Sequence, residues 1–261
     1  MKTRVGVNSY IVREISGHGI SIDELGVDLI ELGFDDIKVL TEEGINWSSL
    51  DLLSTLNVRF TIHSPTSEGR TIAVDLGRYS RRNIRVMENV FRVAQALNAR
   101  YVVMHGGDIH ESYHKAFINT KRQLMELATI AEEYGVKLVI ENLLDNRIGV
   151  FPHELIPMFE DNVGFCFDIG HAFITARKYG LDLGSFLTLS PEHVHLHDNM
   201  GIRDEHRAIG EGKIPLFVFR EILEKGPRNV ILEIRRYSSE DSILRSIEFV
   251  RRRAIKYAVK V

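Results

Sequence analysis

Residues 100–105, RYVVMH, and residues 137–142, KLVIEN, are short apolar segments that contain β-branched residues. Between them lies AFINTKRQLMELATIAEEY (116–134), a longer stretch in which apolar residues recur with the period of a helix. A strand, a helix and a second strand in this order predict two parallel strands joined by a crossover helix. The same alternation continues in both directions along the chain.

Segments of the first kind predict eight strands, at residues 4–8, 35–40, 58–63, 100–105, 137–142, 163–168, 193–198 and 229–234. Helices are predicted at residues 21–32, 46–56, 80–97, 116–134, 216–225 and 238–257, whereas the fifth and sixth crossovers are short and are interrupted by Pro157 and Gly180. Eight such units in roughly 250 residues match an α/β fold of one closed (β/α)8 TIM barrel. An open doubly wound sheet is the alternative, but no GxGxxG motif follows the first strand.

Composition places limits on the kind of protein. No linker or low-complexity tract interrupts the chain, so we expect one domain over residues 1–261, with 44% hydrophobic and 26% charged residues as in ordinary globular proteins. The net charge of −3 creates no general attraction to nucleic acid or anionic lipid, although local basic patches could do so. Neither a run of ~20 apolar residues nor a signal-peptide core is present, which predicts a cytoplasmic protein without a membrane partner. The oligomeric state is left open.

Polar side chains follow the apolar part of most predicted strands, at the ends where a TIM barrel places its active site. HVHLHD (193–198) alternates histidine with Val194 and Leu196, so its histidines can face the barrel interior while the apolar residues face the helices. His193, the deepest of them, is expected to be a hydrogen-bonded core residue. The residues at the strand ends are His63, His105, Glu141, Asp168, His195, His197 and Glu233.

These residue types predict a divalent cation. Buried carboxylates are costly unless they are paired or coordinate a metal, and several of them converge with histidines at one barrel mouth. Cys166 is the one cysteine of the chain, which excludes a multi-cysteine zinc site and leaves histidine and carboxylate as ligands. Such ligands suit Mn, Mg, Co or Zn alike.

Two further motifs extend the predicted site. In DIGH (168–171), Gly170 permits a tight turn that brings Asp168 and His171 to the same centre. In the loop after the seventh strand, Asp204 and His206 lie two residues apart and can share a metal, although a solvated loop with turn glycines would give the same pattern. The remaining histidines are expected to be ordinary surface residues without nearby carboxylates: His18, His110, His114 and His153.

A basic cluster precedes the third predicted helix. Arg78, Arg81 and Arg82 lie where guanidinium groups and a helix N-terminus could hold the phosphate of a substrate. A charged first turn in water is the alternative interpretation.

The order of the strand-end motifs resembles the xylose isomerase-like barrel superfamily, which includes sugar isomerases and epimerases, inosose dehydratases and endonuclease IV. The motifs that carry the resemblance are IHSP (62–65), MHGG (104–107), IEN (140–142), DIGH (168–171), HLHDN (195–199), DEHRAIGEG (204–212) and LEI (232–234). In the isomerase and epimerase branch, the resemblance implies one divalent ion held by Glu141, Asp168, His195 and Glu233. It also implies that His171 contacts the substrate.

The endonuclease IV branch implies a different site, a trinuclear zinc cluster with nine ligands. Its positions match His63, His105, Glu141, Asp168, His171, His195, Asp204, His206 and Glu233. The chain departs from that branch in two places, because VGVNSYIVREISGHG (5–19) replaces the usual GAH-x-S-x-x-GG stretch and SPTSEGR (64–70) lacks an exposed aromatic residue.

These departures favour a metal-dependent isomerase or epimerase that acts on a small polyol, a sugar or a sugar phosphate. Glu141 and Glu233 are the expected acid-base residues, which move a proton through an enediolate that the metal stabilises. One alternative is a zinc-dependent phosphodiesterase at apurinic or apyrimidinic sites, for which alone nucleic acid would be a partner. The other is a metal-bearing barrel that only binds a small ligand or a protein partner.

Overall fold

The computed structural model describes residues 2–19 and 21–258. The order of neighbouring strands in the sheet is β1-β10-β9-β8-β7-β6-β5-β2, that of a closed parallel barrel. This confirms the predicted TIM barrel. The bounds are Arg4–Asn8 (β1), Leu29–Gly33 (β2), Arg59–His63 (β5), Tyr101–Met104 (β6), Lys137–Glu141 (β7), Val163–Asp168 (β8), His193–Leu196 (β9) and Asn229–Leu232 (β10). Outside the barrel, β3 (Leu40–Thr41) and β4 (Gly44–Ile45) form a small antiparallel pair.

The chain divides into two compact units. Unit 1 comprises the residues up to Glu31 and those from Cys166 onward, and unit 2 comprises Leu32–Phe165. That the whole chain forms one domain therefore stays a prediction. No helix within residues 2–19 and 21–258 combines the length and the apolar character needed to cross a membrane.

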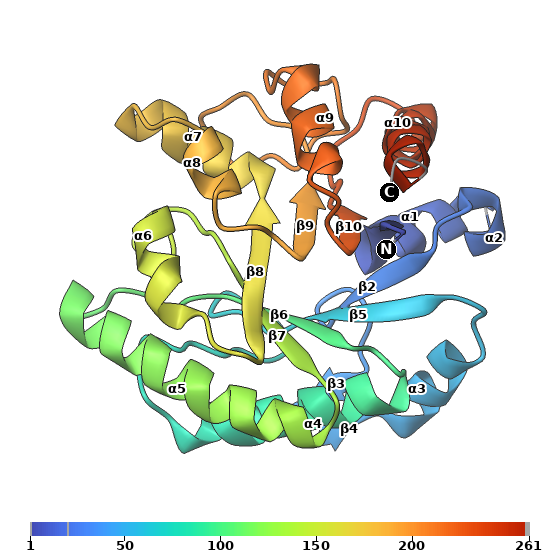
Figure 1. Ribbon diagram of the computed structural model, residues 1–261. Helices are drawn as coiled ribbons and strands as arrows, with labels where there is room; N and C mark the ends of the chain where they lie inside the picture. The colour runs from blue at the N-terminus through green and yellow to red at the C-terminus, as the bar shows by residue number, and fades with distance from the viewer. Residues whose placement is uncertain (1, 20, 259–261) are drawn as a thin grey trace. The chain divides into compact units, whose positions relative to one another are not determined.

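Unit 1 contains β1 beside β10, β10 beside β9, and β9 beside β8, all parallel. The register places Asp168 opposite His195 and His195 opposite Ile231, so the ends of these strands lie at one level. α10 packs against α9 (Figure 1). It also packs against β1. The helices of this unit are α1 (Ser9–Gly17), α2 (Ile22–Leu25), α7 (Ile169–Tyr179), α8 (Gly184–Leu187), α9 (Leu216–Glu224) and α10 (Glu240–Ala258).

Unit 2 contains the parallel strands β5, β6 and β7, with Ile62 opposite Val102 and Val103 opposite Val139. Two long amphipathic helices, α4 and α5, pack against each other along these strands (Figure 1). Ser80 begins α4 as its N-cap by accepting a hydrogen bond from the Arg82 amide. The helices here are α3 (Trp47–Ser54), α4 (Arg81–Ala96), α5 (Tyr113–Glu133), α6 (Pro152–Leu155) and a short 3₁₀ helix (Ile156–Met158).

The second strand was predicted wrongly. Residues 21–32 were expected to be helical and residues 35–40 to be a strand, but the helix ends after one turn and β2 follows at Leu29–Gly33. Gly26 stops the helix because its φ of 59° lies in the left-handed region. Residues 29–32 are all buried, as in a parallel strand covered on both faces, and such an apolar run can be mistaken for a helix.

A first helix was also missed. α1 begins directly after β1, where the side chain of Asn8 accepts a hydrogen bond from the Ile11 amide at 3.2 Å and caps the helix. With α1 in place as the first crossover, Glu31 lies within a barrel strand instead of on a helix. That change adds a carboxylate to the interior of unit 1.

Candidate metal centre

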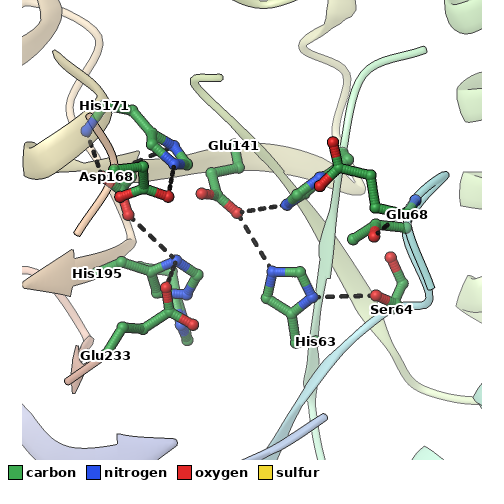
Figure 2. Close-up of polar contacts among 12 residues, drawn as sticks. His63, Ser64, Glu68, Glu141, Asp168, His171, His195 and Glu233 are labelled. Atoms are coloured by element: carbon green, nitrogen blue, oxygen red, sulfur yellow. Dashed lines mark hydrogen bonds and ion pairs between the residues drawn. The ribbon is translucent and has the colours of Figure 1, made fainter. Parts of the chain in front are cut away.

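The strand ends of unit 1 bring three of the predicted metal ligands together. Asp168 ends β8, His195 lies on β9 and Glu233 directly follows β10. Asp168 and His195 are completely buried, and Glu233 is 8% exposed. Nδ1 of His195 is 3.5 Å from a carboxylate oxygen of Glu233 and 3.9 Å from one of Asp168 (Figure 2). An imidazole nitrogen and two carboxylates therefore face one another in the core.

This donor set suits a divalent ion. Two ligand atoms, each about 2.0–2.1 Å from a tetrahedral ion, lie roughly 3.3–3.4 Å apart. The 3.5 Å between His195 Nδ1 and Glu233 Oε2 is close to that separation. Because both carboxylates are buried, their charge needs compensation that a metal would supply. His195, Asp168 and Glu233 are the residues of unit 1 that would hold the ion.

The other nitrogen of His195 contacts Glu31, a residue that the sequence analysis did not include. Nε2 of His195 is 2.8 Å from Oε1 of Glu31, and Nε2 of His193 is 2.8 Å from Oε2. Burial by itself raises the pKa of Glu31, but His195 and His193 outweigh this effect and hold the pKa well below 4.5. Glu31 is therefore an ionised carboxylate between two histidines. The stop at Gly26 was the available signal that residues 29–33 begin a new element.

A second donor set lies in the loop after β9. Asp204 Oδ2 is 3.2 Å from Nε2 of His171 and 2.8 Å from Nε2 of His206. Nδ1 of His206 donates a hydrogen bond to the carbonyl of Glu233 at 3.0 Å, which directs Nε2 toward Asp204. Burial raises the pKa of Asp204, but His171 and His206 more than reverse this and lower it. The structure brings Asp204 and His206 together with His171, and that residues 204 and 206 share a metal stays a prediction.

His197, one of the predicted strand-end residues, contacts the carboxylate of Asp168. Its Nε2 lies 3.1 Å from both oxygens of Asp168. Burial lowers the pKa of His197, but Asp168 and then Asp204 offset this and raise it to about 9. At neutral pH His197 is therefore cationic, and its Nε2 holds both oxygens of the Asp168 carboxylate. Gly170 lies in α7, and a Cβ there would meet the His197 ring at 1.9 Å, so close approach rather than a turn requires glycine.

Asp198 organises the loop instead of offering a ligand. Its two oxygens accept hydrogen bonds from four backbone amides at 2.8–3.1 Å. Gly212 is needed for this arrangement, because a Cβ would lie 2.2 Å from Asp198 Oδ1. The donors are Asn199, Gly210, Gly212 and Ile214.

Unit 2 has its own donor set, made by His63, His105 and Glu141. Oε2 of Glu141 is 3.5 Å from Nε2 of His63 and 3.2 Å from Nε2 of His105 (Figure 2). Nδ1 of His63 donates to the carbonyl of Ser64 at 3.0 Å, which directs Nε2 toward the carboxylate. Burial lowers the pKa of His105, and Glu141 offsets this only in part, so His105 is neutral as a metal ligand must be.

Two of the histidines that were expected to lack a nearby carboxylate have one. His110 was expected to have no nearby carboxylate, but its Nε2 is 2.6 Å from Asp75, so that expectation was wrong. His18 likewise lies 3.4 Å from Glu240.

Arg82, in the basic cluster before α4, donates hydrogen bonds to the Ala73 carbonyl at 2.7 Å and to Glu42 at 2.9 Å, and both contacts are exposed to solvent. Phosphate binding by Arg78, Arg81 and Arg82 stays a prediction.

A family model described as xylose isomerase-like TIM barrel matches residues 21–253. The chain belongs to this family. The uncharacterized protein MJ1614 of Methanocaldococcus jannaschii is 29% identical over 233 residues, which cover 85% of this chain and 87% of that protein.

Solved structures of the same architecture include sugar epimerases. A D-tagatose 3-epimerase-like protein is 26% identical, with a TM-score of 0.74 and coverage of 99% of both chains. The D-allulose 3-epimerase from Methylomonas sp., solved with D-allulose, has a TM-score of 0.70 and covers 97% of both chains. At 16% identity that second likeness shows the fold alone.

Proposed function

We propose that the protein is a divalent-metal-dependent isomerase or epimerase of a ketose or a related sugar phosphate. The observation that carries the proposal is the arrangement around Nδ1 of His195, which faces the buried carboxylates of Glu233 and Asp168 at 3.5 and 3.9 Å. Similarity to a D-tagatose 3-epimerase-like protein at 26% identity supports the same reaction class. Glu141 is assigned as the fourth ligand from its place at the end of β7 and from the family resemblance.

In this reaction a proton leaves a carbon beside a carbonyl and returns. A bound divalent ion would polarise the substrate carbonyl and thereby stabilise the developing negative charge. A carboxylate oxygen of Glu141 or Glu233 takes up the proton from the carbon, and the other glutamate returns a proton to the substrate. His171 would orient a substrate oxygen, with Asp204 at 3.2 Å from its Nε2 to hold the ring. His197 keeps Asp168 in place through its Nε2, which lies 3.1 Å from both carboxylate oxygens.

The test combines metal content with proton exchange. Protein purified without chelator is analysed for metals by plasma mass spectrometry, and the same sample is incubated with ketoses in D₂O. About one Mn, Co, Mg or Zn per chain, together with deuterium at a carbon beside the ketone, would support the proposal. Metal-loaded protein that exchanges no carbon-bound proton of any ketose or ketose phosphate would overturn it.

A second candidate, phosphodiester hydrolysis with several metal ions, is favoured by one specific observation. Two additional donor sets exist, His171 with Asp204 and His206, and His63 with His105 and Glu141. In each set one histidine donates its Nδ1 proton to a backbone carbonyl, the arrangement typical of metal-ligating histidines. About three zinc ions per chain and cleavage of a duplex with an abasic site would select this function.

A further inference from the structure

Glu31 is an almost completely buried carboxylate that the proposed reaction does not use. It lies on β2, opposite Asn8 of β1, and is 1% exposed. Its two oxygens are divided between two histidines of β9, Oε1 at 2.8 Å from His195 and Oε2 at 2.8 Å from His193. Both histidines are completely buried. A residue from one strand thus contacts two successive inward residues of another.

These contacts select which nitrogen of His195 carries the proton. A carboxylate 2.8 Å from Nε2 favours a proton on Nε2, because that proton is attracted to the negative charge, and in the form that binds a metal the other ring nitrogen is unprotonated. The lone pair is then on Nδ1. Nδ1 is the nitrogen that faces Glu233 at 3.5 Å and Asp168 at 3.9 Å, where a metal ligand is required.

His193 strengthens this arrangement. The side-chain amide of Asn229 lies 3.5 Å from Nδ1 of His193 and donates to it, so the His193 proton is on Nε2, toward Glu31. The second oxygen of Glu31 is thereby held by His193. With both oxygens engaged, the carboxylate is restrained from rotating away from His195. This gives His193, which was expected to be an ordinary core residue, a connection to the donor set.

We propose that Glu31 is a positioning residue, which keeps His195 in the Nε2-protonated form and presents its Nδ1 to the divalent ion. The inference rests on the proposed function only in that it requires a bound metal. It does not depend on which substrate is converted. Carboxylates that orient metal-ligating histidines commonly change metal affinity when they are replaced, by about 10- to 100-fold.

The first test leaves Glu31 unchanged. Long-range ¹H–¹⁵N spectra of the metal-free protein, labelled at histidine, distinguish a protonated from an unprotonated ring nitrogen, and a His195→Asn variant assigns the signal. We expect His195 to be protonated at Nε2, the nitrogen beside Glu31. A His195 ring without a proton on Nε2 in the folded metal-free protein would overturn the inference.

The second test replaces the charge while keeping the shape. Co²⁺ is titrated into chelator-treated wild-type and Glu31→Gln protein, and binding is followed by the visible d–d absorption of the ion. We expect Co²⁺ to bind the variant about 10- to 100-fold more weakly and with an altered spectrum. Glu154→Gln is the matched control, because Glu154 is also a buried carboxylate, at 4% exposure, but its partners are the amides of Gly149 and Phe151 and the side chain of Tyr113, none of which is a proposed metal ligand. Its Co²⁺ affinity should equal that of the wild type.

The outcomes separate this inference from the proposed function. Wild-type affinity and spectrum in a folded Glu31→Gln protein would overturn the positioning role and leave the epimerase proposal intact. Weaker Co²⁺ binding by the variant, in a protein that converts no sugar, would support the positioning role while the proposed reaction fails. If Glu31→Gln does not fold, the histidine spectra of the wild type still decide.

Discussion

Glu31 in unit 1 and Glu141 in unit 2 are both 1% exposed and both contact two histidines, yet they do so differently. Glu31 gives each histidine its own oxygen, at 2.8 Å in both cases. Glu141 presents one oxygen, Oε2, to both His63 and His105, at 3.5 and 3.2 Å. Direct ion pairs are short, whereas atoms that share a metal lie roughly 3.3–3.4 Å apart.

The comparison teaches that two buried carboxylates with similar neighbours can have different tasks. The spacing around Glu141 suits a ligand, and the spacing around Glu31 suits a residue that orients a ligand. The donor pair of His195 and Glu233, at 3.5 Å, follows the pattern of Glu141.

The largest effect is expected for Glu233→Gln. An amide cannot take up the proton, so turnover should fall by about 10²- to 10⁴-fold while the fold is retained. The measurement is the rate of deuterium incorporation into a ketose, with circular dichroism as the check on folding. Glu154→Gln should retain normal turnover. A Glu233→Gln enzyme with near-normal rates would show that Glu233 is not an acid-base group.

Removal of the two compared carboxylates should affect stability unequally. In metal-free protein, Glu31→Ala should lower the free energy of unfolding by about 3–5 kcal/mol, because it breaks a buried charged contact with two histidines. Glu141→Ala should cost less, since its contacts are longer and His105 is already neutral because burial lowers its pKa. Urea unfolding after chelator treatment measures both. An equal loss in the two variants would remove the distinction between them.

Acid should weaken the contribution of Glu31 to the stability of the folded protein. The folded-state pKa of Glu31 is depressed, so its contribution to stability is complete above the unfolded value near 4.5 and is lost as the pH falls below it. In metal-free protein, the urea midpoint of the wild type should therefore decline more steeply below about pH 4.5 than that of Glu31→Gln. Parallel declines for the two proteins would show that Glu31 is not held ionised by the histidines.

Gly170→Ala tests the packing that supports Asp168. An added Cβ would lie 1.9 Å from the His197 ring, so we expect a loss of about 1–3 kcal/mol in the free energy of unfolding. Gly17→Ala is the control in α1, where no atom lies within 4 Å of the added Cβ. Thermal or urea unfolding compares the two. If Gly170→Ala left the free energy of unfolding unchanged, the His197 ring would be able to shift without cost.

The smallest effect on stability is expected for the double change Arg81→Ala, Arg82→Ala. Both residues are exposed, and the contact of Arg82 with Glu42 is a surface ion pair, so the free energy of unfolding should change by no more than about 1 kcal/mol. If these residues bind phosphate, KM should rise for a phosphorylated ketose and not for the unphosphorylated one. An unchanged KM for both would end the phosphate hypothesis.

Much of the site could be read from alternation along single strands. In β8 and β9, apolar residues separate Asp168 and the histidines, and the period of two is a local property of an extended chain. The prediction failed at β2, because a fully buried parallel strand has no such alternation and Glu31 stood inside an apolar run. Asp75 beside His110 was missed for a different reason: the two residues are 35 positions apart in the chain.

The sequence by itself determined the fold class, the family and the residue types of a candidate metal site, because strand and helix periods and strand-end motifs are local patterns. Only the tertiary structure decided how the histidines are distributed among carboxylates. It assigned Glu31 to His193 and His195, His197 to Asp168, and Asp198 to the loop amides. These pairings depend on the register between strands that are distant in the chain, and no periodicity within one strand records that register.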